Sequence, residues 1–435
     1  MDKSVLMVAY HYPPAQASGT QRAVGFGKYL SQFGYRPLIL SVHPMAYEHC
    51  DAFGGGGMTA DVVVVRSKAL DTARHLAIRG RYARALALPD RWSTWLLTAI
   101  PAGLWMIWKY KPKMIWSTYP IATSLLIGWA LSRVSGLPWI VDLRDPLVIG
   151  RHPLDPTVRK LFIKLEARVL QRCDRIVVTT QGLMELLTQR YPNVAADKWK
   201  IIANGYDDEV FDDPEIIRIM ESKPTSNGPE RVITLLHSGT LYTGPEERNP
   251  APFLDVLAGL VQSGRICGFQ GRRGRGIRMR VVFRATGHDE QIRAMIQARQ
   301  LEDLVVLQPT LPYRESLLEM VAVDGLLLFQ GEAFDRLVPA KLFEYLRSGR
   351  PVFALVGNRG DARKILEACD APYIVPLEDR HLIGSNLVTF LDDLVQNRPY
   401  TSPGERVKIY SRWAGARALA ELLDDMLRTR EAADG

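Results

Sequence analysis

The sequence predicts an α/β protein that contains two parallel β-sheets, each covered by helices. Short apolar runs rich in β-branched residues alternate with longer amphipathic stretches, which is the pattern of parallel strands joined by helices. The pattern runs through the first half of the chain and begins again near residue 231. The 435 residues are enough for two domains of about 200 residues each. We therefore expect two facing Rossmann-like domains, with a ligand cleft between the carboxyl ends of their sheets.

The individual elements follow from the same pattern. In the first half we expect strands at residues 5–9, 37–42, 62–66, 114–117, 139–142, 175–179 and 200–203, and helices at 21–33, 123–135 and 155–172. In the second half we expect strands at 232–237, 279–285, 305–308, 325–329 and 351–356, and helices at 252–262, 289–298, 339–347 and 361–369.

The domain boundaries are predicted from composition. Residues 1–211 form the expected N-terminal domain, and residues 231–402 the second domain. Between them, 212–230 is rich in Pro, Ser, Asn, Gly and charged residues without strand periodicity, which favours a linker. Residues 403–435 carry apolar residues at helical spacing, so we expect a terminal helix that packs back on the N-terminal domain.

Composition and charge limit the class of protein. The hydrophobic share of 47% and the charged share of 23% are those of a globular protein. The formal charge of +8 is compatible with nucleic acid, an acidic membrane surface or a phosphorylated substrate. The four cysteines are scattered without C-x-x-C spacing, so neither a metal site nor a disulfide framework is expected.

The same features suggest a cytoplasmic location. Met1 leads directly into the strand expected at 5–9, so no signal peptide is expected. The most apolar stretch, residues 95–108, is shorter than the roughly 20 residues that span a bilayer. We expect a cytoplasmic protein that either stays in solution or lies on the inner face of the cytoplasmic membrane.

The loop after the first strand is a candidate phosphate site. It contains Ser18-Gly19-Thr20 and then becomes helical, so backbone N–H groups and the helix dipole could meet a phosphate there. A simple turn with a Ser or Thr cap explains the same residues. The loop matches neither G-x-G-x-x-G nor G-x-x-x-x-G-K-[ST], which disfavours nicotinamide cofactors and P-loop chemistry.

A second candidate follows the strand at 139–142. Asp142 and Asp145 bracket Arg144 at the carboxyl end of that strand. Two carboxylates and a guanidinium could orient a hydroxyl nucleophile, and a self-contained ion-pair cluster is the alternative. The sequence spacing does not give the separation of the two carboxyl groups that hydrolysis of a glycoside would depend on.

The second half offers a third set of residues. Lys341 and Glu344 are three apart at the start of the helix expected at 339–347, so they share one face. The carboxylate could accept ribose hydroxyls while the lysine neutralises phosphate, although an ion pair on a solvated face has the same spacing. Gly239-Thr240 lies in a small-residue loop after the strand at 232–237, and Arg248 follows as a possible pyrophosphate clamp.

Two basic stretches invite other interpretations. Residues 66–84 mix six basic side chains with apolar residues and could lie on an anionic membrane surface. The short Gly/Arg run at 271–276 could touch RNA, but it has no interleaved aromatics, so a solvated loop fits it better and nucleic acid is not the expected partner.

Taken in order, six segments resemble the family-four retaining glycosyltransferases, in particular those of bacterial exopolysaccharide and O-antigen synthesis. They cover nearly the whole chain and read HYPP at 11–14 with SGT at 18–20, WSTYP at 116–120, PWIVDLRDP at 138–146, NGYD at 204–207, SGTL at 238–241 and PAKLFEY at 339–345. Each segment is weak alone, and the ordered set is fairly specific.

The resemblance implies the GT-B fold, with a nucleotide-sugar donor held mainly by the second domain and a saccharide or lipid-linked saccharide acceptor held mainly by the first. Glu344 matches the glutamate on the donor ribose, and Lys341 with Arg248 would neutralise the diphosphate. Ser18, Gly19, Thr20, Gly239 and Thr240 would contact the donor through the two loops, and Leu311-Pro312 would read the nucleobase edge. Asp142, Arg144 and Asp145 fall at the acceptor side. The reaction would retain anomeric configuration without a cofactor or an obligatory metal.

The chain departs from the family pattern at three places. The family has a second glutamate eight positions before Glu344, where this chain has Arg336, and it often has an arginine where this chain has Thr240. The lysine that normally follows that arginine is absent, and Arg248 is only an approximate substitute for it. Two other functions therefore stay open. A sugar-nucleotide epimerase with the same fold would need no acceptor, and a non-catalytic relative would serve as a scaffold or bind RNA.

Overall fold

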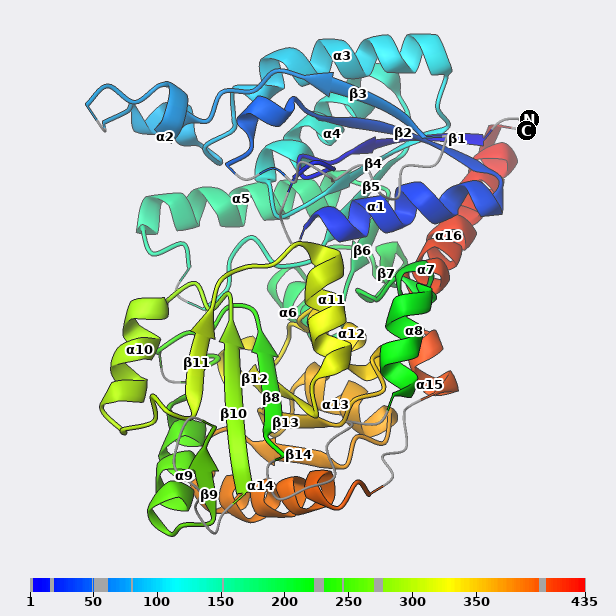
Figure 1. Cartoon of the computed structure of the whole chain (residues 1–435). Helices are drawn as coiled ribbons and strands as arrows, with labels where there is room; N and C mark the ends of the chain where they lie inside the picture. Colours follow the sequence, from blue (N-terminus) through cyan, green and yellow to red (C-terminus); the bar gives the residue numbers. More distant parts are fainter. Residues whose placement is uncertain are drawn as a thin grey trace. The chain divides into compact units, whose positions relative to one another are not determined.

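The computed structural model describes residues 3–15, 19–48, 50, 62–79, 81–150, 152–222, 231–244, 246–269, 277–398 and 404–434. The chain divides into two compact units (Figure 1). Unit 1 comprises Met1–Asn204 and Arg412–Gly435, and unit 2 comprises Gly205–Ser411. The Gly/Arg run at 271–276 lies outside the described residues.

Unit 1 contains a seven-stranded parallel sheet in the order β3-β2-β1-β4-β5-β6-β7. Its strands are β1 (Lys3–Val8), β2 (Tyr35–Val42), β3 (Val63–Ser67), β4 (Met114–Thr118), β5 (Trp139–Leu143), β6 (Arg175–Val178) and β7 (Trp199–Ile201). Its α-helices are α1 (Thr20–Tyr29), α2 (Thr72–His75), α3 (Trp95–Tyr110), α4 (Ala122–Ser135), α5 (Pro156–Arg172), α6 (Gln181–Arg190) and α16 (Arg412–Asp434).

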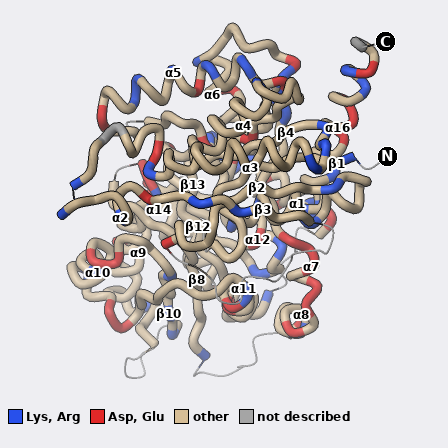
Figure 2. Tube along the Cα trace, turned by 90° about the horizontal axis from the view of Figure 1, so that it is seen from above, with Lys and Arg blue, Asp and Glu red and all other residues tan. Residues whose placement is uncertain are grey.

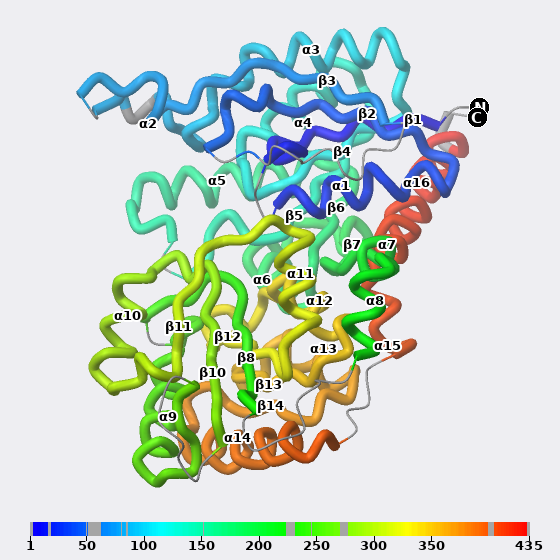
Figure 3. Tube along the Cα trace, viewed as in Figure 1, coloured from blue at the N-terminus to red at the C-terminus, as the bar shows by residue number. Residues whose placement is uncertain are grey.

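Both faces of this sheet are covered, which explains why its strands are apolar at nearly every position. Leu6 and Val8 point into a core shared with α3, α4, α5 and α6. Val5 and Met7 point the other way, toward α1 and α16. Figure 3 shows α1 and α16, from opposite ends of the sequence, side by side on that face.

Unit 2 contains a second parallel sheet in the order β11-β10-β8-β12-β13-β14, with β9 paired to β10. Its strands are β8 (Ile233–Ser238), β9 (Ile266–Gly268), β10 (Ile277–Arg284), β11 (Val305–Gln308), β12 (Gly325–Gln330), β13 (Val352–Val356) and β14 (Tyr373–Pro376). Its α-helices are α7 (Asp208–Phe211), α8 (Pro214–Glu221), α9 (Ala251–Gln262), α10 (Asp289–Gln297), α11 (Tyr313–Ala322), α12 (Lys341–Arg347), α13 (Asp361–Ala368), α14 (Arg380–Val395) and α15 (Glu405–Lys408).

The two parallel sheets confirm the predicted fold class. The structure differs from the sequence prediction in several elements. Strands β9 and β14 were not expected, because the first ends in Gly268 and the second in Pro376, residues that favour loops. Helix α8 occupies part of the segment 212–230 that composition marked as a linker, and it packs on α11 within unit 2. The chain changes units after Asn204 and again after Ser411, so the terminal segment is split between α15 in unit 2 and α16 in unit 1.

Candidate active site

In each sheet the strand order reverses beside the first strand of the unit. In unit 1, β1 lies between β2 and β4, and in unit 2, β8 lies between β10 and β12. The loops that leave two such neighbours diverge to opposite faces of the sheet, and open α/β sheets bind ligands at that point. The loops after β1 and β8 hold Gly19 and Gly239, so both small-residue loops predicted from the sequence lie at switch points.

Lys341 is the central cation of the unit 2 site. It is the first residue of α12, and its ammonium group donates a hydrogen bond to the backbone carbonyl of Ser238. A Cβ atom on Gly239 would collide with that ammonium group, and Gly239 also has a φ of +121°. Both the space and the backbone conformation therefore require glycine at position 239.

Burial lowers the pKa of Lys341 to about 7, and the positive charge of Arg248 lowers it further while Glu344 opposes the shift. The lowered pKa means that the surroundings of Lys341 disfavour its charged ammonium form when no anion lies beside it. A bound anion would favour the charged form of Lys341 again, so the site is suited to a diphosphate.

This shift predicts a pH dependence. Because the pKa of Lys341 is about 7, the free protein loses the lysine charge as pH rises above 7. We expect the affinity for a nucleoside diphosphate to fall above pH 7, by up to about tenfold for each pH unit. Calorimetric titrations between pH 6 and 9 measure this. The dependence should disappear in Lys341→Met, and an equally steep fall in that variant would assign it to another group.

Arg248 is held beside Lys341 by a fixed arrangement. Its Nε donates to Oε1 of Gln330 at 2.9 Å, and its guanidinium carbon lies 4.9 Å from the centre of the Phe334 ring. Gln330 is fully buried, and its amide donates to the carbonyls of Phe334 and Leu337, both at 2.8 Å. The Gln330 amide oxygen and the Phe334 ring thus help to position the guanidinium.

Glu344 lies on α12 and is positioned by a tyrosine of α11, the α-helix that precedes α12 in the chain. Its Oε1 accepts a hydrogen bond of 2.8 Å from the hydroxyl of Tyr313. Tyr313 begins α11 directly after Leu311 and Pro312. The structure therefore brings the predicted nucleobase loop and the predicted ribose carboxylate together. Thr240, also in the predicted donor set, lies against Gly287.

In unit 1, Asp142 is buried and fully engaged. The guanidinium of Arg22 donates to both its carboxylate oxygens at 2.7–3.0 Å, and the Thr118 hydroxyl donates at 2.9 Å. The same guanidinium donates to the carbonyls of Ile202 and Ala203 at 3.0 Å. Because Asp142 has no exposed surface, its carboxylate acts here as a link between α1, β5 and the segment after β7.

Arg144 is the residue of this group that reaches the glycine loop. A Cβ on Gly19 would lie 2.6 Å from Nη2 of Arg144, so the absence of a side chain lets the guanidinium approach. Nε of Arg144 donates to the carbonyl of Tyr119 at 3.0 Å. Burial lowers the pKa of Arg144, and the adjacent Asp145 opposes that shift. Arg144 and Asp145 are both partly buried rather than fully enclosed.

The rest of the glycine loop is partly described. Thr20 begins α1 and donates from its hydroxyl to the carbonyl of Ala15 at 3.1 Å, whereas Ser18 lies outside the described residues. Burial and the charge of Arg144 lower the pKa of His11 to about 4, so this imidazole is neutral at pH 7.

The basic stretch at 66–84 is partly used inside the unit. Arg66 donates to the carbonyls of Pro13 and Val42, and Arg74 donates to that of Tyr47. Arg79 and Arg81 are exposed. These bonds reduce the number of cations in the stretch that could face an anionic surface.

Sequence reasoning missed the residues that position the predicted ones. They are His237, Gln330, Tyr313 and Tyr345 in unit 2, and Arg22 and Thr118 in unit 1. His237, for example, is buried between the carbonyls of Leu327 and Gly239 at 2.9 and 3.1 Å. Tyr345 accepts a 2.9 Å hydrogen bond from the backbone N–H of Ser238. Tyr345 and Thr118 lay inside segments that the sequence had marked, and Tyr313 and Arg22 lay at the end of such segments, but none of the four had been given a positioning role. His237 and Gln330 gave no local signal of one.

The described residues contain neither a metal-binding cluster nor a membrane-spanning helix. Within the described ranges, no cluster of three or more His, Cys, Asp or Glu side chains is arranged to hold a metal ion. None of the helices in those ranges is both long and apolar enough to cross a bilayer.

Part of the chain matches a known sequence family. Residues 41–205 match the sequence model of the family described as glycosyl transferase 4-like domain. None of the curated protein sequences matches the chain significantly.

Solved structures match over nearly the whole chain. Sucrose-phosphate synthase from Thermosynechococcus elongatus is 15% identical with a TM-score of 0.65, and the match covers 99% of this chain and 100% of that one. HepE from Anabaena, in complex with UDP-glucose, is 13% identical with a TM-score of 0.63, covering 97% and 99%. The lipopolysaccharide outer core galactosyltransferase WaaB is 11% identical with a TM-score of 0.57, covering 97% and 99%. The chain therefore has the GT-B fold, and residues 41–205 form a glycosyl transferase 4-like domain.

Proposed function

We propose that the protein transfers a sugar from a nucleotide-diphosphate sugar to a saccharide or lipid-linked saccharide, with retention of anomeric configuration, in the synthesis of a surface polysaccharide. The observation that carries this proposal is the arrangement in unit 2. There Lys341, Arg248 and Glu344 gather around the loop after β8, two cations and a carboxylate that match a diphosphate and a ribose. The similar HepE structure contains UDP-glucose, which supports a donor of this class.

In this proposal unit 2 holds the donor. Lys341 and Arg248 neutralise the charge that develops on the leaving diphosphate. The Glu344 carboxylate gives up its hydrogen bond from the Tyr313 hydroxyl and accepts hydrogen bonds from the ribose hydroxyls instead. Leu311-Pro312 and the backbone around Gly239 and Thr240 complete the donor contacts. Preorganised cations of this kind stabilise the transition state without reorganisation during the reaction.

Unit 1 supplies the acceptor contacts in the same proposal. Arg144 and Asp145 orient the acceptor hydroxyl, Asp142 positions them through β5, and Gly19 with Ser18 and Thr20 lets the backbone approach the diphosphate. The hydroxyl attacks on the face that the nucleotide leaves, and a diphosphate oxygen takes its proton. Catalysis is then mostly positioning and charge stabilisation, so neither a cofactor nor a metal is needed, and a chelator is expected to leave the rate unchanged.

A thermal-shift panel with UDP, GDP, ADP and CMP tests the donor site. A ligand at 100 times its dissociation constant stabilises a protein by about 2.7 kcal/mol. We expect one nucleotide to raise the melting temperature of the wild type but not of Glu344→Ala, because the variant lacks the ribose carboxylate. Glu315→Ala removes an exposed carboxylate of α11 and is expected to respond like the wild type. Equal stabilisation of Glu344→Ala would remove Glu344 from the donor site.

A further inference from the structure

Two neighbouring helices of unit 1 present large apolar side chains to solvent. On α3, Leu97 is 79% exposed, Trp105 43% and Trp108 76%, and on α4, Trp129 is 42% and Val134 67% exposed. Positions 97, 105 and 108 lie on one side of α3, whereas Ala99, Gly103 and Met106 on the opposite side are buried. The two helices pack on each other, and Figure 1 shows α3 as the outer layer over β2 and β3. We call these five exposed residues the α3–α4 face.

The part of the chain that contains α3 and α4 carries side-chain charge of a single sign. No Asp or Glu occurs between Asp90 and Asp142, whereas the same interval holds Lys109, Lys111, Lys113 and Arg133, all of them exposed. Figure 2 looks onto α3 from above and shows the basic residues of this part of unit 1. The ammonium group of Lys109 lies 4.6 Å from the centre of the Trp105 ring. Exposed tryptophans and cations are therefore interleaved on this surface.

We propose that the α3–α4 face binds the surface of an anionic lipid bilayer. Tryptophan favours the headgroup level of a membrane, where its ring is partly apolar and its N–H remains hydrated. Lysine and arginine beside it are attracted to anionic headgroups. A second copy of the chain fits less well, because a two-fold contact would place this basic surface against itself without acidic residues to neutralise it.

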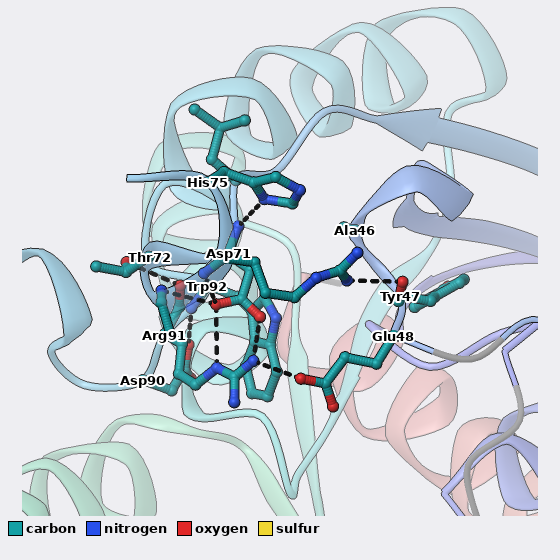
Figure 4. Close-up of polar contacts among 12 residues, drawn as sticks. Ala46, Tyr47, Glu48, Asp71, Thr72, His75, Asp90, Arg91 and Trp92 are labelled. Carbon is teal, nitrogen blue, oxygen red and sulfur yellow. Dashed lines mark hydrogen bonds and ion pairs between the residues drawn. The ribbon is translucent and has the colours of Figure 1, made fainter. Parts of the chain in front are cut away.

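The segment before α3 connects this face to the loop after β1, which carries Gly19. The Asp71 carboxylate accepts from Arg91, which also binds Glu48 at 2.8 Å (Figure 4). Beside this network, the ring of Trp92 lies 5.0 Å from that of Tyr10, in the loop after β1. The same segment exposes Ile78 and Leu86. A lipid-linked acceptor held at the bilayer would thus approach unit 1 beside the loop that carries Gly19.

Vesicle flotation tests the proposal without donor or acceptor, so it is independent of the transfer reaction. The wild type is expected to float with phosphatidylglycerol–phosphatidylethanolamine vesicles and not with phosphatidylcholine vesicles. We expect Trp105→Ser/Trp108→Ser to bind at least about tenfold more weakly, because affinity scales with the apolar area inserted. Lys113→Gln and Arg133→Gln should each weaken binding about fivefold, as about 1 kcal/mol per cation implies.

Matched controls separate the face from general surface properties. Leu154→Ser removes a side chain that is 73% exposed elsewhere in unit 1, and Lys164→Gln removes an exposed lysine of α5. Both should bind as the wild type does, and so should Glu344→Ala even if it has lost the donor. Circular dichroism spectra and melting temperatures confirm that each variant is folded.

Three outcomes would overturn the proposal. The wild type could fail to float with anionic vesicles, or it could bind phosphatidylcholine vesicles as strongly as anionic ones. In the third outcome, Trp105→Ser/Trp108→Ser floats as the wild type does. Light scattering adds one more test, because a wild-type dimer that the double variant dissociates would assign the face to a second copy. None of these outcomes changes the thermal shift that nucleotides produce, so the proposed transferase function is tested independently of membrane binding.

Discussion

Replacing Lys341 with methionine is expected to lower kcat/KM for the nucleotide-sugar donor by about 10²- to 10³-fold. Methionine keeps the length of the side chain but removes the charge beside Arg248. The leaving diphosphate then loses a preorganised cation, and initial rates at several donor concentrations measure the effect.

The stability of the same variant distinguishes chemistry from unfolding. The pKa of Lys341 falls from 10.5 in the unfolded chain to about 7 in the folded protein, so at neutral pH the buried amine lowers the free energy of unfolding rather than raising it. Lys341→Met should therefore melt at or above the wild-type temperature. Lys364→Met is the matched control, because the Lys364 side chain is 59% exposed in its ion pair with Asp361 and an ion pair of an exposed lysine contributes little to stability. A loss of activity below about threefold in Lys341→Met would contradict a role in stabilising charge in the transition state.

Asp142→Asn is expected to lower the free energy of unfolding of unit 1 by about 3–5 kcal/mol, because it leaves the buried guanidinium of Arg22 without its counter-charge. Arg22 and Asp142 side chains are 5% and 0% exposed and 2.7 Å apart. Denaturant titration followed by circular dichroism measures the change.

Asp145→Asn is the control for that prediction. Asp145 is adjacent to Arg144 but only partly buried, so its substitution should reduce transfer to the acceptor while costing less than about 1 kcal/mol of stability. If Asp142→Asn were as stable as the wild type and lost only activity, Asp142 would be a contact to the acceptor after all.

The sequence predicted those strands and helices whose hydrophobic pattern is contained within the element itself. Strands such as β11 (Val305–Gln308) matched to the residue, because they are short, apolar and bounded by polar loops. Strands β9 and β14 were missed because β9 ends in Gly268 and β14 in Pro376, and both residue types are typical of loops rather than strands. Helix α8 was missed because it begins within a segment rich in loop-forming residues. Its Asp213 N-cap accepts from the N–H of Glu215, a signal that the composition of 212–230 concealed.

The candidate site was predictable only in part for a related reason. Lys341 and Glu344 are three positions apart, so sequence spacing alone places them on one helix face. Their fixed geometry depends on Ser238 and Tyr313, more than 100 and 31 positions away, and no local pattern contains that information. For Asp142 the sequence left both a ligand role and an ion-pair cluster open, and only the distant residue Arg22 reveals that the carboxylate forms a buried ion pair.

The most direct test of the central claim is release of nucleotide from a sugar donor with and without an acceptor. The wild type is incubated with the nucleotide sugar selected by the thermal-shift panel and with saccharide or lipid-linked saccharide acceptors. Nucleotide and product are followed by chromatography and mass spectrometry, and the anomeric configuration of the new linkage by nuclear magnetic resonance.

The account predicts that nucleoside diphosphate appears only when an acceptor is present, with one sugar mass added to the acceptor and the donor's anomeric configuration retained. Conversion of the donor to an isomeric sugar without any acceptor would contradict it in favour of an epimerase. No turnover and no nucleotide binding would instead indicate a non-catalytic relative.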